Sequence, residues 1–162
     1  MPRTWLTWCH GAVANVETDP ATDPAAGTGA LTKRDFEALA RFRAGIRRYL
    51  RFSEETVRSH GATPQQYQLM LALKGYPGRE WATVRELADQ LQLRHHSVVE
   101  LVDRAQTQGL VERGPHPADA RAVRVSLTGD GERLLGRLSA LHRDELRRMD
   151  GVLTPPTWQD GG

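Results

Sequence analysis

The stretch from residue 83 to residue 128 constrains the fold of this chain more than any other feature. Thr83 and Glu86 form a T-x-x-E capping box that begins a helix, and apolar residues then recur at helical spacing. A second such helix follows a turn at Leu93, and Gly109 stands where a left-handed C-cap residue is expected. We therefore predict two short amphipathic helices joined by a tight turn.

A β-hairpin is predicted directly after the second helix. Alternation of apolar Val123, Val125 and Leu127 with polar residues is typical of a half-buried strand. Gly114 and Pro117 mark the loop of the hairpin. Two helices and a hairpin in this order form a helix-turn-helix with a wing, which presents one exposed helix to a DNA major groove and one loop to a minor groove or phosphate.

Longer helices are predicted on both sides of this element. Thr32 with Asp35 begins a helix of about 28 residues that ends at Gly61, with apolar positions on more than one face. Thr63 followed by Pro64 begins the next helix, and Thr128 caps the last one. The predicted fold class is mainly α, a winged helix-turn-helix with a two-stranded β-wing and flanking dimerisation helices.

Composition indicates one globular domain outside any membrane. The chain has 162 residues, 39% hydrophobic and 26% charged, and no apolar run near the ~20 residues that span a bilayer. A single cysteine favours a reducing, cytoplasmic compartment. No nucleophile elbow, phosphate loop or zinc motif is visible, so we do not expect an enzyme and expect no cofactor. Residues 1–30, rich in Pro, Gly, Ala and Asp, are predicted to be a disordered tail.

The chain resembles the MarR family of bacterial transcriptional regulators from about Leu31 to Met149. The resemblance is carried by the run RELADQLQLRHHSVVELVDRAQTQGLVER, the wing sequence D-x-R and the closing SLTGDGERLL. It implies a winged-helix domain at 31–150, with dimerisation helices at 31–60 and 129–150, a DNA-binding part at 63–128, and a C-terminal tail at 151–162. The usual last dimerisation helix of the family has no counterpart in the tail.

The resemblance also implies a DNA-binding surface. It comprises Thr83 at the start of the first helix and, on the second helix and its entrance, Arg94, His95, His96, Ser97, Val99, Glu100 and Arg104. Arginine, histidine and serine donate hydrogen bonds to guanine or phosphate, valine contacts a thymine methyl group, and glutamate accepts from cytosine. Many relatives place Arg or Thr where His96, Val99 and Glu100 stand. The alternative interpretation is a solvated helix face.

Arg121 matches the arginine with which the family's wing reaches the minor groove. Asp119 would orient its guanidinium through a charge-assisted hydrogen bond. Arg124 is a further candidate for a phosphate contact. The alternative for the Asp119–Arg121 pair is a surface ion pair of little energetic value.

The other candidate sites are weaker. The first helix is rich in arginine, and Arg43 and Arg47 could line a pocket for a small anionic or aromatic effector, as in the family, although a solvated face is the simpler interpretation. The adjacent His95 and His96 diverge by about 100° on a helix, so no metal site is expected. Cys9 lies in the tail, before the helix in which the family's oxidant-sensing cysteines lie, and we interpret it as an ordinary thiol.

Together these observations predict a cytoplasmic bacterial repressor that binds a pseudo-palindromic double-stranded operator as a homodimer and is released by a small ligand. The alternative is a winged-helix protein-interaction module that has lost DNA binding. Seven arginines balance seven acidic residues over 79–128, which favours the alternative, whereas Arg94, Arg121 and the two histidines favour DNA binding. The surplus of basic residues lies instead in the first helix, over 31–60.

Overall fold

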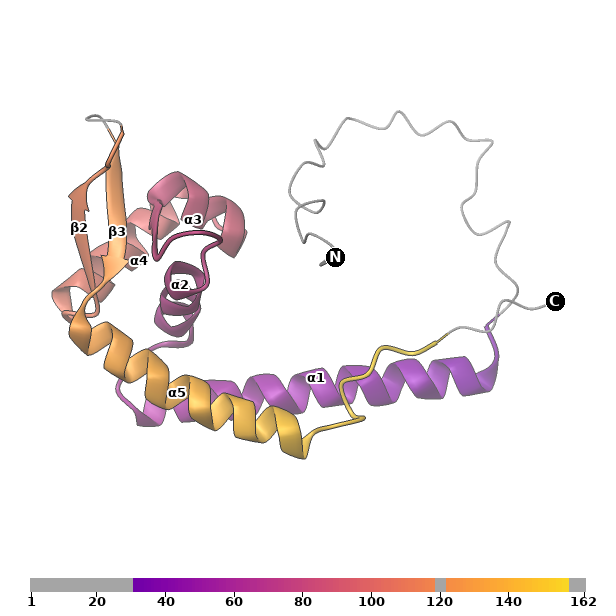
Figure 1. Cartoon of the computed structure of the whole chain (residues 1–162). Coiled ribbons are helices and arrows are strands. Elements are labelled where there is room, and N and C mark those ends of the chain that lie inside the picture. Colours follow the sequence, from indigo (N-terminus) through magenta and orange to yellow (C-terminus); the bar gives the residue numbers. More distant parts are fainter. Residues whose placement is uncertain (1–30, 119–121, 158–162) are drawn as a thin grey trace, which may run out of the picture.

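The computed structural model describes residues 31–118 and 122–157. Its elements are, in order, α1 (Lys33–Ser59), α2 (Pro64–Lys74), β1 (Trp81–Thr83), α3 (Val84–Leu91), α4 (His95–Thr107), β2 (Val111–Pro115), β3 (Val123–Leu127) and α5 (Gly129–Arg148). The long helices α1 and α5 lie side by side, and α2, α3, α4 and the sheet form a separate head at one end of them (Figure 1). The predicted tail 1–30, with Cys9, lies outside the described residues.

Threonine caps begin four of the five helices in the described part of the chain. Thr32, Thr63 and Thr83 each form a complete capping box with the residue three positions later. The Thr128 hydroxyl accepts from the Gly131 N–H at 3.1 Å and so caps α5. These local hydrogen bonds satisfy backbone donors that a helix leaves unpaired, and they confirm the predicted helix starts.

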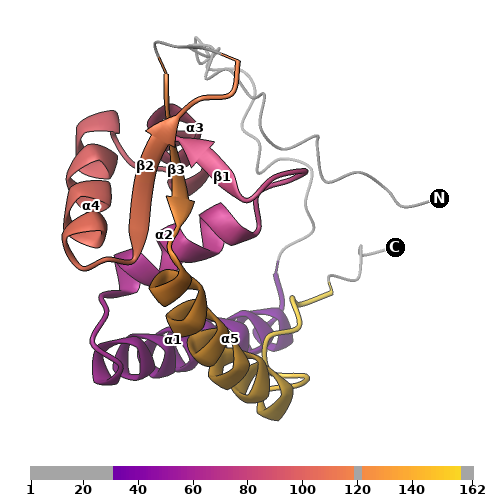
Figure 2. The ribbon, with the colours of Figure 1, turned by 60° about the vertical axis from the view of Figure 1, so that its left-hand side comes forward.

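The sheet has three antiparallel strands in the order β1-β3-β2, where two strands were predicted. The additional strand β1 pairs Ala82 with Val125 of β3, and Val125 also lies opposite Arg113 of β2. Residues opposite one another share a face, so Ala82, Val125 and Arg113 point toward the helices. Thr83, Arg124 and Gly114 form the neighbouring row, on the outer face of the sheet. Figure 2 shows the three strands side by side.

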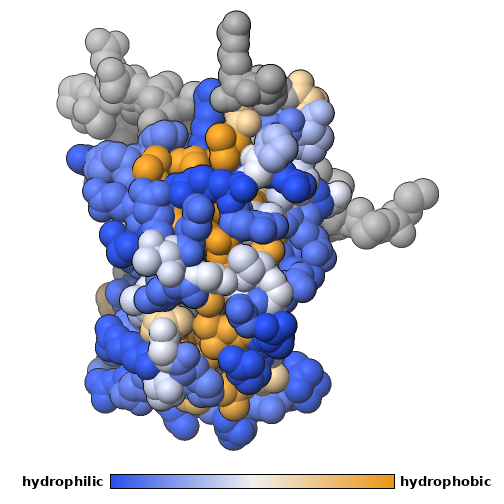
Figure 3. Space-filling view, turned by 90° about the vertical axis from the view of Figure 1, so that its left-hand side faces the viewer, coloured by the Kyte–Doolittle hydropathy of each residue, from blue (hydrophilic) through white to orange (hydrophobic). Residues whose placement is uncertain are grey.

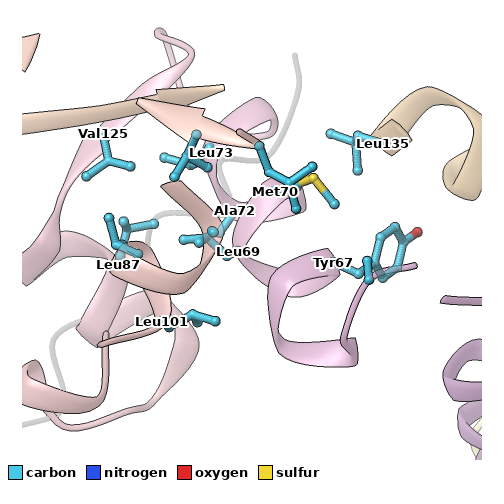
Figure 4. Close-up of a cluster of buried hydrophobic side chains, with 14 of the residues drawn as sticks. Tyr67, Leu69, Met70, Ala72, Leu73, Leu87, Leu101, Val125 and Leu135 are labelled. Atoms are coloured by element: carbon cyan, nitrogen blue, oxygen red, sulfur yellow. The ribbon is translucent and has the colours of Figure 1, made fainter. Parts of the chain in front are cut away.

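The core of the head is built around α2. Leu69, Met70 and Leu73 have no exposed surface and lie between the sheet, the helix-turn-helix and α5 (Figure 4). Leu87 of α3 and Leu101 of α4 close the same cluster. The predicted buried face of α4 is confirmed, since Val98, Leu101, Val102 and Ala105 are all at most 2% exposed. This core fixes how α3 and α4 are presented to solvent.

A buried histidine joins α5 to α1 and α2. His142 is 3% exposed; its Nδ1 lies 2.6 Å from the Leu138 carbonyl oxygen and its Nε2 2.8 Å from the Ser53 hydroxyl of α1. The ring stacks on Tyr67 of α2, with centroids 4.4 Å apart. Downstream, Val152 folds back against Gly45 of α1, where a Cβ would meet its side chain at 2.7 Å. The long helices are therefore connected to the head by specific contacts.

Candidate nucleic-acid interface

The N-terminus of α4 is exposed and has no side-chain cap. Arg94 occupies the N-cap position without a capping hydrogen bond, unlike the threonines that begin the other helices of the described chain. Val98 is the first residue of this helix whose N–H makes a backbone hydrogen bond; it donates to the Arg94 carbonyl at 3.2 Å. The preceding amides point outward at the positive end of the helix dipole, which suits an anion such as phosphate.

The predicted contact residues of α4 lie on its solvent side. Arg94, His95, His96, Glu100 and Arg104 are exposed, whereas Ser97 and Val99 are half-buried at the edges of the face. Val99 was predicted on the outer face and lies at its border. Glu100 and Arg104 are 3.6 Å apart in an i, i+4 pair, so part of the positive charge on this face is neutralised. Among these contact residues, hydrogen-bond donors stand beside one carboxylate, that of Glu100.

Thr83 and Glu86 form the capping box that begins α3. The predicted DNA contact of Thr83 would need the same hydroxyl group that makes this capping hydrogen bond. The Thr83 hydroxyl accepts from the Glu86 N–H at 3.3 Å, and the Glu86 carboxylate accepts from the Thr83 N–H at 2.8 Å. Burial raises the pKa of Glu86, but the hydrogen bonds from Thr83 and Arg79 outweigh burial and hold the pKa below its ordinary value. The carboxylate is therefore a fixed negative charge at the end of the sheet.

An arginine that the sequence did not identify joins the wing to α4. Arg113 of β2 lies 2.6 Å from the Asp103 carboxylate and donates to the Gln106 side chain at 2.7 Å. Its position opposite buried Val125 turns it toward the helix rather than toward solvent. The wing and α4 are thereby held in one orientation. Strand register would have indicated this contact, but the register was unknown before the strands were placed.

The predicted wing residues are only partly within the described chain. Asp119 and Arg121 lie outside the described residues, in the sequence between β2 and β3. Arg124 is in the central strand and half-buried, and its side chain crosses Gly114, where a Cβ would lie 2.9 Å from its Nε. The glycine therefore leaves room for the Arg124 guanidinium to cross β2.

A stack of aromatic and guanidinium groups covers the outer face of the sheet. Arg79 lies over the rings of Trp81, at 3.8 Å, and Tyr76, at 4.5 Å, and forms an ion pair with Glu86. Trp81 in turn makes a T-shaped contact with His116, which follows the wing strand β2, with ring centroids 5.0 Å apart. This stack connects the loop before β1 with both α3 and the wing.

Comparison with known proteins shows what this arrangement resembles. The MarR family model matches residues 60–122. The uncharacterized HTH-type transcriptional regulator YsmB of Bacillus subtilis is 31% identical over 101 residues, which are 59% of this chain and 63% of YsmB.

The chain is similar in sequence and in fold to MarR family transcriptional regulators. The chain spans less than two thirds of the length of this curated relative, YsmB.

The MarR-type fold extends beyond the matched segment. AbsC, a MarR family transcriptional regulator from Streptomyces coelicolor, superposes with a TM-score of 0.64 at 21% identity, covering 80% of this chain and 86% of AbsC. A cysteine-to-serine mutant of MarR from E. coli, complexed with operator DNA, superposes with a TM-score of 0.57 at 22% identity, covering 74% of this chain and 84% of that one.

Apolar side chains remain exposed on the two long helices. Leu31 is exposed just before α1, Phe36 and Leu50 are exposed on it, and Leu141 and Leu146 are exposed on α5. Figure 3 looks onto the head and the near end of the long helices, and this face has a narrow apolar band between hydrophilic margins. Within the described residues, no helix is long and apolar enough to cross a membrane, and no group of three or more His, Cys, Asp or Glu residues could hold a metal ion.

A pocket of about 800 Å³ opens where α2 meets α1 and α5. It is lined by Tyr49, Tyr67, Leu71, Ser139, His142, Arg143, Leu146, Arg147 and Asp150. Burial raises the pKa of both tyrosines. Arg43 and Arg47, predicted to line an effector pocket, are exposed on α1 and do not line it. The arginines of this pocket come from α5 instead.

Proposed function

We propose that this chain is a transcriptional regulator that binds a specific double-stranded DNA sequence as a homodimer. The observation that carries the proposal is the free, exposed N-terminus of α4 beside Arg94, held by Arg113 at a fixed orientation to the wing. In this arrangement α4 enters the major groove, and the wing reaches the adjacent minor groove or backbone. The MarR–operator complex, which has the same fold, supports this reading.

The homodimer follows from the exposed apolar side chains of α1 and α5. Two copies related by a two-fold axis would cover these residues with the same surface from each chain. The two reading heads would then face successive major grooves, about one DNA turn apart, and a pseudo-palindromic operator would match their symmetry. Because the charge over 79–128 is balanced, a single head should bind weakly and two heads are needed.

We further propose that the regulator is a repressor released by a small anionic or aromatic ligand bound between α2, α1 and α5. The pocket there offers aromatic rings from Tyr49 and Tyr67 and positive charge from Arg143 and Arg147. It touches both long helices and the first helix of the head, so a ligand in it would alter how the heads are spaced. Occlusion of a promoter by the dimer would account for repression.

The proposal is tested by selecting duplexes from a randomised library with the full-length chain and measuring affinity by fluorescence anisotropy. Arg94→Ala should weaken binding about fivefold to a hundredfold, because one charged donor to base or phosphate is lost. Arg137→Ala, which removes an exposed arginine from α5, is the matched control and should bind like wild type. Equal affinities for the two variants would overturn the proposed role of α4.

The competing function is a protein-interaction module. The exposed Glu100 carboxylate in the middle of the α4 face favours it, since a carboxylate repels the phosphate backbone. If the wild-type chain enriches no duplex at low salt, the winged helix does not bind DNA and this second function becomes the better account.

A further inference from the structure

We propose that Arg79 positions the wing relative to the helix-turn-helix. This residue would then set the geometry of DNA binding without touching DNA itself. The inference rests on the proposed function for its consequence, but the structural part of it can be tested without DNA.

The first observation is the double stack. The Arg79 guanidinium lies 3.8 Å from the ring centroid of Trp81 and 4.5 Å from that of Tyr76. Tyr76 belongs to the loop after α2, and Trp81 begins the strand β1. A cation held against aromatic faces is attracted by their electron-rich surfaces. Arg79 therefore fixes this loop and the edge strand together.

The second observation is that the stack has a partner at each end. On one side, Arg79 pairs with Glu86, whose carboxylate also accepts the Thr83 N–H at the start of α3. On the other side, the rings of Trp81 and His116 meet in a T-shaped contact, at an interplanar angle of 89°. A continuous line of contacts thus runs from the helix-turn-helix, through Arg79, to the wing.

The wing end of this line lies directly before the wing tip. His116 follows the last residue of β2, and its Nδ1 accepts the Ala118 N–H at 3.2 Å. This turn lies just before Arg121 in the sequence, the residue for which the family resemblance implies a minor-groove contact. Arg113 attaches the helix-facing side of the sheet to α4, and Arg79 attaches its outer side to α3. With both faces held, the wing cannot tilt freely.

Burial of the guanidinium argues against an incidental surface ion pair. Only 25% of the Arg79 side chain is exposed, and its Nε is buried with no hydrogen-bond partner among the described residues. An unpaired buried donor destabilises the folded state, so a side chain kept there must gain from its other contacts. Only a planar guanidinium can stack on two rings and pair with a carboxylate at once; lysine has the charge but not the plane.

The test compares Arg79→Lys with Arg85→Lys, which makes the same change at an exposed position on α3. The DNA probe is the duplex that the wild-type chain selects from a randomised library. Arg79→Lys should bind it about fivefold to thirtyfold more weakly, as the loss of a desolvated cation–π stack implies. In hydroxyl-radical footprints, protection should be lost at the wing positions and kept in the major-groove half-sites. Arg85→Lys should retain the wing protection.

A second readout needs no DNA. In NMR spectra of the free full-length chain, Arg79→Lys should move the His116 ring resonances, because Trp81 loses the contact that orients its ring current. His116→Ala, a change in a half-buried wing residue that leaves the core intact, should lose the same wing protection as Arg79→Lys.

Unmoved His116 resonances in Arg79→Lys, or wild-type wing protection in either variant, would overturn the inference. If the wild-type chain selects no duplex, the proposed function fails. The NMR comparison alone then decides whether Arg79 holds the wing.

Discussion

Single residues at helix starts could be read from the sequence because capping is local. Thr32, Thr63 and Thr83 each face a partner three residues away, and all three capping boxes form. Gly109, predicted in a left-handed conformation, has φ +70°. Gln92 has φ 54° at the end of α3, a position where glycine would be expected. No local sequence signal predicts this left-handed conformation of Gln92. The packing of Leu93 on the core determines the position of the turn.

At the residue scale, the Glu86 carboxylate should make stability depend on pH. Its pKa is lower in the folded chain than the ordinary 4.5 of the unfolded chain. Its stabilising contribution is therefore complete above about pH 4.5 and is lost as the pH falls through the lower, folded-state pKa. Glu86→Gln keeps the capping geometry, since glutamine also accepts the Thr83 N–H, but cannot titrate.

Urea unfolding of wild type and Glu86→Gln at pH 7 and near pH 3 tests this expectation. The wild-type chain should be the more stable at pH 7, and the difference should shrink in acid. A difference that is constant with pH would show that the carboxylate does not carry the effect.

At the element scale, sequence patterns predicted the helices well and the sheet incompletely. Periodicity over eight or more residues identified α1 to α5, whereas the three residues of β1 are too few to show an alternation. That strand is defined by its pairing with β3, a contact between residues more than 40 positions apart. The Arg79 and Arg113 contacts depend on this sheet, which explains why neither residue was predicted.

Two glycines of α5 provide a test of how this helix packs against the head. A Cβ on Gly131 would lie 2.0 Å from the Leu110 carbonyl oxygen, whereas a Cβ on Gly136 would meet nothing within 4 Å. Gly131→Ala should destabilise the chain by about 1–3 kcal/mol, since backbone must move. Gly136→Ala should stabilise it by up to about 1 kcal/mol through helix propensity.

Thermal and urea unfolding of the two variants give the comparison. Both substitutions add one methyl group to the same helix. Changes of opposite sign in the free energy of unfolding would therefore be due to the close approach of Gly131 to Leu110. Equal effects would show that α5 is free to shift on the head.

At the scale of the whole molecule, the long helices of the proposed dimer would join two DNA-reading heads. The amphipathic pattern of the sequence predicted the exposed apolar residues of α1 and α5, but it could not place the pocket beneath α2. Pocket walls come from three helices, so Arg143 and Arg147 line it rather than the predicted Arg43 and Arg47. The contacts of Asp119 and Arg121 stay a prediction, to be tested by DNA binding.

The most direct test of the central claim is the stoichiometry of the chain on its selected duplex. Light scattering and sedimentation of the complex should give two 18.1 kDa chains per duplex. Hydroxyl-radical footprints should show two protected half-sites, centred about 10 base pairs apart or a multiple of that spacing. One chain per duplex, a single half-site, or no complex at low salt would contradict the account.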